Sequence, residues 1–294
     1  MADKYHDTVA KSTVTTDDAA VAAAVKKILD ENLADSHTPD NLKLLLGCID
    51  LTTLRSTDSP NSIMKFVERV NDFENEHGDL PCVAAVCTWP NLVATARTVL
   101  EVSEVNIAAV AGGFPSAQTF PEVKMAETAL AAEGGADEVD VVMNLGYFLD
   151  DDWEQVSDEL EEMSHSCRGA RMKVILETGA LVTAEKIRAA SVLALYSGAD
   201  FLKTSTGKEW PGATVEAAYV MCSCIREYFK ATGRKVGFKA AGGITTAEQA
   251  LAYYCIVKAV LGEEWLTPEY FRIGASRLAN NLLSEILGEE TRFF

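Results

Sequence analysis

Two lysines within short apolar runs are the side chains of this sequence best suited to covalent chemistry. Lys203 lies in the run Phe201-Leu202-Lys203-Thr204, and Lys239 lies in Val236-Gly237-Phe238-Lys239. In a buried β-strand such a lysine points into a low-dielectric environment, which lowers its pKa and makes the neutral amine nucleophilic. The alternative is a lysine at a strand end whose ammonium simply reaches solvent.

The two lysines should be neighbours if their runs form consecutive parallel strands. Adjacent strands lie about 4.8 Å apart, so the ammonium groups could approach within roughly 6 Å. At an effective dielectric near 20 their repulsion is about 2.8 kcal/mol, or about two pK units. Lys203 would then keep a neutral fraction at pH 7 and could attack a carbonyl to form a Schiff base.

Further charged residues lie in the other apolar runs: Asp50, Glu138, Asp140, Lys173 and Glu177. Asp140 is our candidate for moving protons to and from the carbinolamine. For Glu138, Lys173 and Glu177 we favour a structural role in an internal ion-pair network. For Lys203 and Lys239 we favour the catalytic role.

The elements that must position these residues form eight repeats of an apolar run followed by an amphipathic pattern. The predicted strands are 48–54, 83–87, 107–111, 138–143, 172–177, 201–204, 236–240 and 271–273. The predicted helices are 61–77, 92–100, 122–133, 153–166, 184–196, 214–230, 246–261 and 276–287. This order predicts a (β/α)8 TIM barrel over residues 48–294. A doubly wound sheet is disfavoured because no Gly-x-Gly-x-x-Gly follows the first strand.

Residues 1–47 are predicted to be an N-terminal extension with one or two helices. Residues 1–16 are polar and expected to be mobile, one helix should follow Asp17, and another should begin after Thr38. We expect this extension to cover the bottom of the barrel.

Glycine-rich turns follow the last two predicted strands: Ala241-Gly242-Gly243 and Gly274-Ala275-Ser276. Such turns, with a helix N-terminus, form the usual phosphate site of these barrels. Lys208 could add positive charge. The sequence therefore predicts a phosphorylated small-molecule substrate.

The overall composition limits the partners. The 294 residues carry a formal net charge of −18, which argues against nucleic acid or an anionic membrane. The absence of a signal-like start and the seven scattered cysteines favour reduced thiols in the cytoplasm. The four histidines lie in polar stretches, so we expect no metal centre and no cofactor.

Several blocks together resemble the deoxyribose-phosphate aldolases, which are class I aldolases of the (β/α)8 type. The most specific are Gly198-Ala199-Asp200-Phe201-Leu202-Lys203-Thr204-Ser205-Thr206-Gly207 and Val236-Gly237-Phe238-Lys239-Ala240-Ala241-Gly242-Gly243. Also similar are the blocks at 50–54, 84–87, 135–142 and 173–179. The resemblance implies reversible, metal-independent cleavage of 2-deoxy-D-ribose 5-phosphate to acetaldehyde and D-glyceraldehyde 3-phosphate.

The resemblance also implies roles for single residues. Lys203 would form the Schiff base, Lys239 would tune its pKa, Asp140 would relay protons and Asp50 would support this network. Cys87 matches a cysteine near the substrate. The implied substrate- and phosphate-binding residues are Thr52, Cys87, Thr206, Lys208, Gly242, Gly243, Gly274 and Ser276. The implied partners are small aldehydes and sugar phosphates, with a homodimer as a possible assembly.

Three positions depart from the family pattern. Ala240 replaces a proline, Arg277 replaces a second serine and is expected to alter phosphate affinity, and Arg292-Phe293-Phe294 replaces a tyrosine-bearing tail. Two alternatives stay open: a class I aldolase or transaldolase for another sugar phosphate, and a non-catalytic sugar-phosphate sensor on the same barrel.

Overall fold

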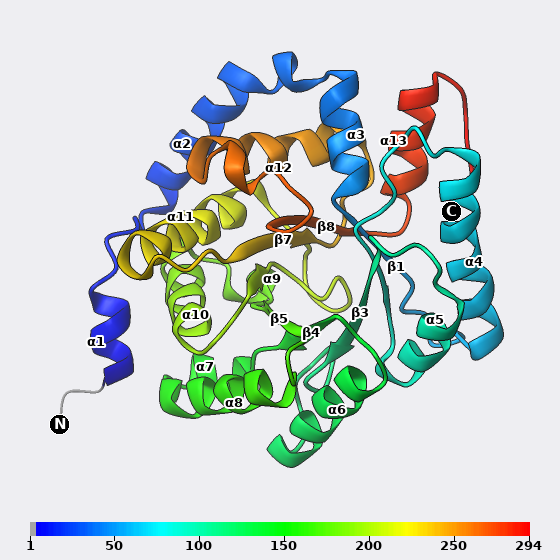
Figure 1. The fold of residues 1–294 in the computed structure, drawn as a ribbon. Coiled ribbons are helices and arrows are strands. Elements are labelled where there is room, and N and C mark those ends of the chain that lie inside the picture. The colour runs from blue at the N-terminus through cyan, green and yellow to red at the C-terminus, as the bar shows by residue number, and fades with distance from the viewer. Residues whose placement is uncertain (1–3) are drawn as a thin grey trace.

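The computed structural model describes residues 4–294, in which eight parallel strands close into a barrel (Figure 1). Each strand pairs with the next in sequence order, and β8 pairs with β1. The strands are β1 Ile49–Thr52, β2 Ala85–Thr88, β3 Asn106–Ala111, β4 Glu138–Val142, β5 Arg171–Ile175, β6 Phe201–Lys203, β7 Gly237–Ala241 and β8 Phe271–Ala275. The predicted (β/α)8 barrel is confirmed.

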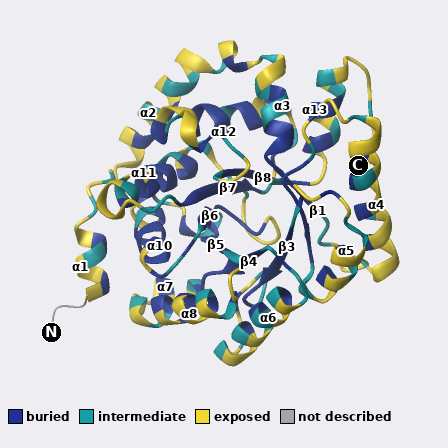
Figure 2. Cartoon of the chain, viewed as in Figure 1, coloured by how far each residue is buried: buried dark blue, intermediate teal, exposed yellow. Residues whose placement is uncertain are grey.

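An outer layer of helices surrounds the strands, and the buried residues concentrate on the strands and the inward faces of these helices (Figure 2). The layer consists of α4 Pro60–Glu76, α5 Val93–Val99, α6 Pro121–Glu133, α8 Trp153–Ser166, α10 Ala184–Tyr196, α11 Val215–Thr232, α12 Ala247–Val260 and α13 Leu278–Leu287. Hydroxyl side chains cap several helices, as Thr214 caps α11 by accepting from the Ala217 N–H at 3.1 Å.

Five short elements were not predicted: the helices α7 Leu145–Leu149 and α9 Thr178–Leu181, and the 3-10 turns η1 Ala34–Ser36, η2 Pro90–Leu92 and η3 Glu263–Trp265. Each spans at most about one turn and a half, which is too short to show a helical period in the sequence.

The N-terminal extension differs from our expectation. Three α-helices precede β1: α1 Lys4–Ala10, α2 Asp18–Asn32 and α3 Pro39–Gly47. They pack on the outside of the helix layer, α1 against α8 and α10, α2 against α11 and α12, and α3 against α12 and α13 (Figure 1). The prediction that the extension covers the bottom of the barrel is therefore wrong.

Residues 4–16 contain a helix and contacts to the barrel helices that the sequence did not indicate. Tyr5 and Val9 bury their side chains, and Glu227 on α11 accepts hydrogen bonds from Ser12 Oγ at 2.6 Å and from the Thr13 N–H at 2.7 Å. Only two apolar positions anchor α1, which is why its short polar sequence gave no helical signal.

The register of the strands aims the charged residues into the barrel. Lys203 lies opposite Lys239, and Asp140 lies opposite Lys173. Gly237 makes room for this interior, since a Cβ there would lie 2.3 Å from the Phe201 ring. Within residues 4–294, no helix has both the length and the apolar character that crossing a membrane requires.

Candidate active site

A network of seven charged side chains fills the barrel interior, and all are 5% exposed or less. The cations are Lys173, Lys203, Lys239 and Arg272, and the carboxylates are Asp50, Glu138 and Asp140. We call these seven residues the buried charge cluster. When every group is ionised the cluster carries one more positive charge than negative. Burying an uncompensated charge is costly, so loss of one proton from a lysine balances the cluster.

Asp140 is the centre of this cluster. Its Oδ2 accepts from Lys203 Nζ at 2.8 Å and from Lys239 Nζ at 2.7 Å, while its Oδ1 accepts from Lys173 Nζ at 3.1 Å. The two catalytic candidates are thus bound to one oxygen atom. The expected close approach of the two ammonium groups is confirmed.

Asp50 holds the opposite side of the cluster. Its Oδ2 accepts from Lys239 Nζ and, at 3.2 Å, from Lys173 Nζ, and its Oδ1 accepts from Arg272 Nη1 at 2.7 Å. Lys239 therefore contacts two carboxylates, whereas Lys203 contacts only Asp140 among the described residues.

Glu138 and Arg272 complete the cluster at greater depth. Arg272 Nη2 donates to Glu138 Oε1 at 2.8 Å, Lys173 pairs with Glu138, and Asn106 Nδ2 donates to Glu138 Oε1 at 3.1 Å. Sequence reasoning missed Arg272. The available signal was a lone guanidinium between Phe271 and Ile273 in a predicted strand.

The carboxylates are held ionised. Burial opposes the charge on Asp140, but Lys173, Lys203 and Lys239 outweigh it and hold the pKa of Asp140 well below its usual range. Burial likewise opposes the charge on Asp50, yet Lys173, Lys239 and Arg272 keep its pKa low. The pKa of Glu138 is also lowered, chiefly by Lys173 and Arg272 against the effect of burial.

The lysines differ from one another. Burial, assisted by the nearby Lys239 cation, lowers the pKa of Lys203, and Asp140 only partly opposes this. Burial also acts on Lys239, but Asp140 and Asp50 together raise its pKa. The pKa of Lys173 is raised in the same way by Asp140, Asp50 and Glu138. Lys203 is therefore the lysine of the cluster that loses its proton most readily, and burial rather than lysine repulsion is the main cause.

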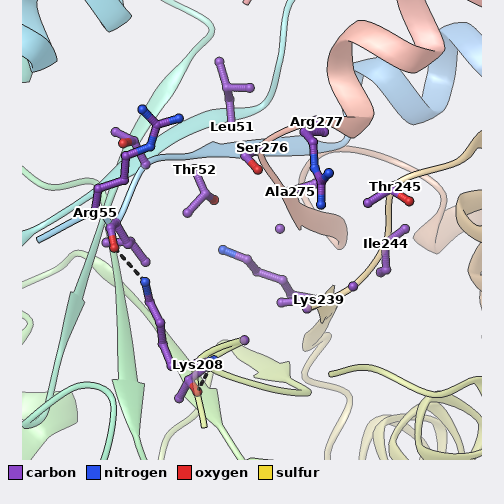
Figure 3. A pocket seen from close by; sticks show the side chains of 18 of the residues that line it. Leu51, Thr52, Arg55, Lys208, Lys239, Ile244, Thr245, Ala275, Ser276 and Arg277 are labelled. Carbon is purple, nitrogen blue, oxygen red and sulfur yellow. Dashed lines mark hydrogen bonds between the residues drawn. The ribbon is translucent and has the colours of Figure 1, made fainter. Parts of the chain in front are cut away.

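A cavity of about 490 Å³ opens above the cluster at the carboxyl ends of the strands (Figure 3). Lys203 and Lys239 line it, with Asp50 and Asp140 beneath them. Its size is that of a small-molecule site. The amine of Lys203, whose pKa is lowered, therefore lies in a cavity that can hold a small carbonyl compound.

Nearly all of the predicted substrate-binding residues line this same cavity: Thr52, Thr206, Lys208, Gly242, Gly243, Gly274 and Ser276. A Cβ on Gly274 would lie 3.1 Å from Lys239 Cε, and one on Gly242, where φ is +91°, would lie 2.9 Å from Gly212 Cα. These two glycines therefore allow the close approach of neighbouring groups. Arg55, Thr245 and Phe294 also line the cavity and were missed.

Cys87 and Glu177 do not line the cavity. Cys87 is 1% exposed and burial raises its pKa, so its thiol is protonated at neutral pH. Glu177 is the N-cap residue of α9 and has a left-handed φ of 53°, and its carboxylate accepts from the backbone N–H and hydroxyl of Thr206. The expectation that Glu177 belongs to the ion-pair network is wrong, because β5 ends at Ile175 and the chain turns before Glu177.

The described residues contain no group of three or more His, Cys, Asp or Glu side chains able to hold a metal ion. His6, His37 and His165 are exposed and His77 is half-buried, in agreement with the positions expected from sequence.

Comparisons with known proteins agree with this geometry. The chain matches the DeoC/LacD family aldolases over residues 45–261. It is 42% identical over 248 residues to deoxyribose-phosphate aldolase of Homo sapiens, covering 81% of this chain and 78% of that protein. It is 37% identical over 248 residues to that of Agrobacterium fabrum, covering 84% and 92%.

A solved structure of deoxyribose phosphate aldolase from Aeropyrum pernix has a TM-score of 0.68 to this chain at 24% identity, covering 88% of this chain and 97% of that one. This likeness supports the fold alone. From the family match and the two curated relatives, the chain belongs to the DeoC/LacD family of aldolases.

Proposed function

We propose that this aldolase reversibly cleaves 2-deoxy-D-ribose 5-phosphate to acetaldehyde and D-glyceraldehyde 3-phosphate through a Schiff base on Lys203. Relatives named deoxyribose-phosphate aldolase share about two fifths of its residues over most of its length. The observation that carries the mechanism is the single surplus positive charge of the buried charge cluster. That surplus favours the loss of a proton from Lys203, which lines the cavity and has a lowered pKa.

The first step is attack of the neutral Lys203 amine on C1 of the open-chain aldehyde. The carbinolamine then loses its hydroxyl group as water, and a protonated imine remains on Nζ. Asp140, hydrogen-bonded to this nitrogen at 2.8 Å, is our proposed proton relay, acting directly or through a water molecule. Its carboxylate also stabilises the positive iminium, as it does the ammonium.

The second step breaks the bond between C2 and C3. The proton of the C3 hydroxyl passes to Asp140, directly or through a water molecule. The C3 carbonyl forms, and the electron pair of the broken bond flows into the iminium to give an enamine. D-Glyceraldehyde 3-phosphate departs. Protonation of the enamine at C2 and hydrolysis of the resulting imine then release acetaldehyde and restore the amine of Lys203.

Borohydride trapping with acetaldehyde, followed by peptide mass mapping, tests this mechanism. We expect an ethyl adduct on Lys203 that disappears in Lys203→Ala and weakens in Lys239→Leu. An adduct on Lys239 alone would reverse the two lysine roles. Folded protein with no adduct on either lysine argues against Schiff-base catalysis and in favour of the sugar-phosphate sensor.

The substrate is tested separately by comparing cleavage of deoxyribose 5-phosphate with that of longer ketose phosphates. We expect the larger kcat/KM for deoxyribose 5-phosphate. A preference for a ketose phosphate, with the Lys203 adduct intact, would keep the mechanism and replace the substrate.

We also propose a cytoplasmic location and a homodimer. All seven cysteines are free, which suits a reducing compartment.

The homodimer is proposed from the surface of α6. Its N-cap residue Phe120 and its residues Val123 and Leu130 are exposed apolar side chains of the kind that mark contact surfaces. Light scattering on the purified protein measures the assembly, and a monomeric mass would contradict the dimer.

A further inference from the structure

Arg272 lies on β8 inside the barrel, and every nitrogen of its guanidinium donates a hydrogen bond. Nη1 donates to Asp50 Oδ1 at 2.7 Å and to Glu138 Oε2 at 3.1 Å, Nη2 donates to Glu138 Oε1 at 2.8 Å, and Nε donates to the Pro268 carbonyl oxygen. Its Cζ lies 5.8 Å from the centre of the Phe201 ring. Arg272 is 1% exposed and does not line the cavity, so a substrate held there does not touch it.

The positive charge of Arg272 is permanent. A guanidinium is not deprotonated in proteins, and although burial opposes its charge, Asp50 and Glu138 outweigh burial and raise the pKa of Arg272. The other cations of the buried charge cluster are lysines, which can lose a proton when buried. Because the cluster holds four cations and three carboxylates, the surplus proton must leave a lysine.

The ion pairs of the lysines decide which of them loses that proton. Lys173 pairs with all three carboxylates of the cluster, and Lys239 pairs with two of them. Within residues 4–294, Lys203 pairs with Asp140 alone. Since Lys203 has the fewest carboxylates to hold its charge, it is the lysine that gives up the surplus proton.

Arg272 and Lys203 share no partner, so Arg272 acts on Lys203 through Lys173 and the carboxylates. Because Arg272 neutralises part of the charge on its own two carboxylates, Lys173 is shared with Asp140, whose Oδ1 it binds at 3.1 Å. Without the guanidinium, those two carboxylates would draw Lys173 more strongly, and Asp140 would depend more on Lys203. The remaining lysines would then balance the carboxylates, and Lys203 would keep its proton.

We propose that Arg272 is a positioning residue of the aldolase reaction: its fixed charge, held by Asp50 and Glu138, makes Lys203 the amine that is free to attack the substrate. The Schiff base on Lys203 itself rests on the proposed function. Arg272 takes no part in forming or breaking bonds, so its effect should appear in the pH dependence of Lys203 reactivity.

Competitive labelling with acetic anhydride measures the protonation of Lys203 without requiring turnover, because only the neutral amine reacts and peptide mass mapping reads each lysine separately. Arg272→Met removes the surplus charge, so labelling of Lys203 at neutral pH should fall about tenfold or more, which corresponds to an upward shift of about one pK unit. Glu138→Gln enlarges the surplus, so the midpoint of labelling should move to lower pH. The double variant Arg272→Met with Glu138→Gln restores the original surplus, and its midpoint should return toward that of the wild type.

These opposite shifts separate charge from structure. Loosening of the barrel would hydrate Lys203 and move its midpoint to higher pH in every variant, whereas a downward shift in Glu138→Gln requires the change in charge. Lys124→Met is the matched control, because it removes a fully buried cation that pairs with Glu159 at 2.6 Å between α6 and α8, outside the cluster. It should destabilise the fold and leave the Lys203 midpoint unchanged. Circular dichroism checks that each variant is folded, and the exposed Lys230 is the internal standard.

Midpoints that move in the same direction in Arg272→Met and Glu138→Gln, or that stay at the wild-type pH in both, would overturn the role of Arg272. If Arg272→Met does not fold, a double variant whose midpoint stays at that of Glu138→Gln would overturn it equally. Borohydride trapping on the wild type judges the proposed function separately. If the midpoints shift as expected but no adduct forms on Lys203, the role of Arg272 in the charge balance stands and the Schiff-base mechanism fails.

Discussion

Lys203 and Lys239 donate to the same atom, Oδ2 of Asp140, at 2.8 and 2.7 Å, yet their pKa values shift in opposite directions. The difference comes from Asp50, which pairs with Lys239 and has no ion pair with Lys203. Burial acts on both lysines, and the second carboxylate reverses its effect on Lys239 alone. The arrangement keeps one cation fixed beside an amine that can lose its proton.

Replacing Lys239 by Met should move the pH dependence of catalysis upward. The variant removes a cation that lowers the pKa of Lys203 and leaves Asp140 Oδ2 to Lys203 alone. Both changes raise the pKa of Lys203, so the rising limb of kcat/KM should shift to higher pH. The exposed Lys230, replaced by Met, serves as the control. If the rising limb of kcat/KM in Lys239→Met stays at the same pH or moves to lower pH, Lys239 does not lower the pKa of Lys203 as proposed.

Replacing Lys203 by Met should stabilise the fold at neutral pH. The folded-state pKa of Lys203 lies below its usual 10.5, so the unfolded chain binds this proton more tightly. The contribution of Lys203 to wild-type stability therefore becomes more favourable as the pH rises from the folded-state pKa to about 10.5. The advantage of Lys203→Met should therefore shrink as pH approaches that value. Urea unfolding at several pH values measures it.

Lys173→Met provides the contrast, because the pKa of Lys173 is raised. Its charge stabilises the fold, and its loss leaves buried carboxylates poorly compensated, at a cost of about 3–5 kcal/mol. A stabilised Lys173→Met, or a destabilised Lys203→Met, would contradict the charge balance of the cluster.

Asp140→Asn should lower kcat about 10²- to 10⁴-fold, the usual size of a general acid–base contribution. Asp140 opposes the lowering of the Lys203 pKa, so the variant should leave the Lys203 amine neutral. Borohydride trapping of acetaldehyde should then persist while turnover fails. Glu138→Gln is the control, since Glu138 has no ion pair with Lys203. It should reduce stability more than activity, and equal activity losses in the two variants would argue against a relay role for Asp140.

Gly274→Ala should impair both stability and catalysis. The new Cβ would lie 3.1 Å from Lys239 Cε and from Ala241 Cβ, and overpacking of this kind costs about 1–3 kcal/mol. Displacement of Lys239 should also alter the pH dependence of kcat/KM. Gly146→Ala, in α7 and outside the cavity lining, is the control, and identical behaviour of the two variants would contradict the steric role of Gly274.

The sequence alone determined the barrel fold and the inward-facing lysines and aspartates of the active site. Eight apolar runs alternate with amphipathic patterns, and this local periodicity survives in the structure because each strand buries both faces. The alternation of side chains along each run also placed Lys203, Lys239, Asp140 and Asp50 on the inward face. The glycine turn after β7 was visible for the same local reason, since Gly242 and Gly243 have positive φ values. The turn predicted at Gly274 is wrong, because Gly274 lies within β8.

Only the tertiary structure decided which charges meet. Arg272 enters the cluster because barrel closure places β8 beside β1 and Asp50, a contact between residues far apart in the sequence. Glu177 does not join the cluster because β5 ends at Ile175, before Glu177, whose own backbone is left-handed. The pKa of Lys203 depends on burial together with the charges of Asp140 and Lys239. These are properties of distance in space, which residue types and local spacing do not encode.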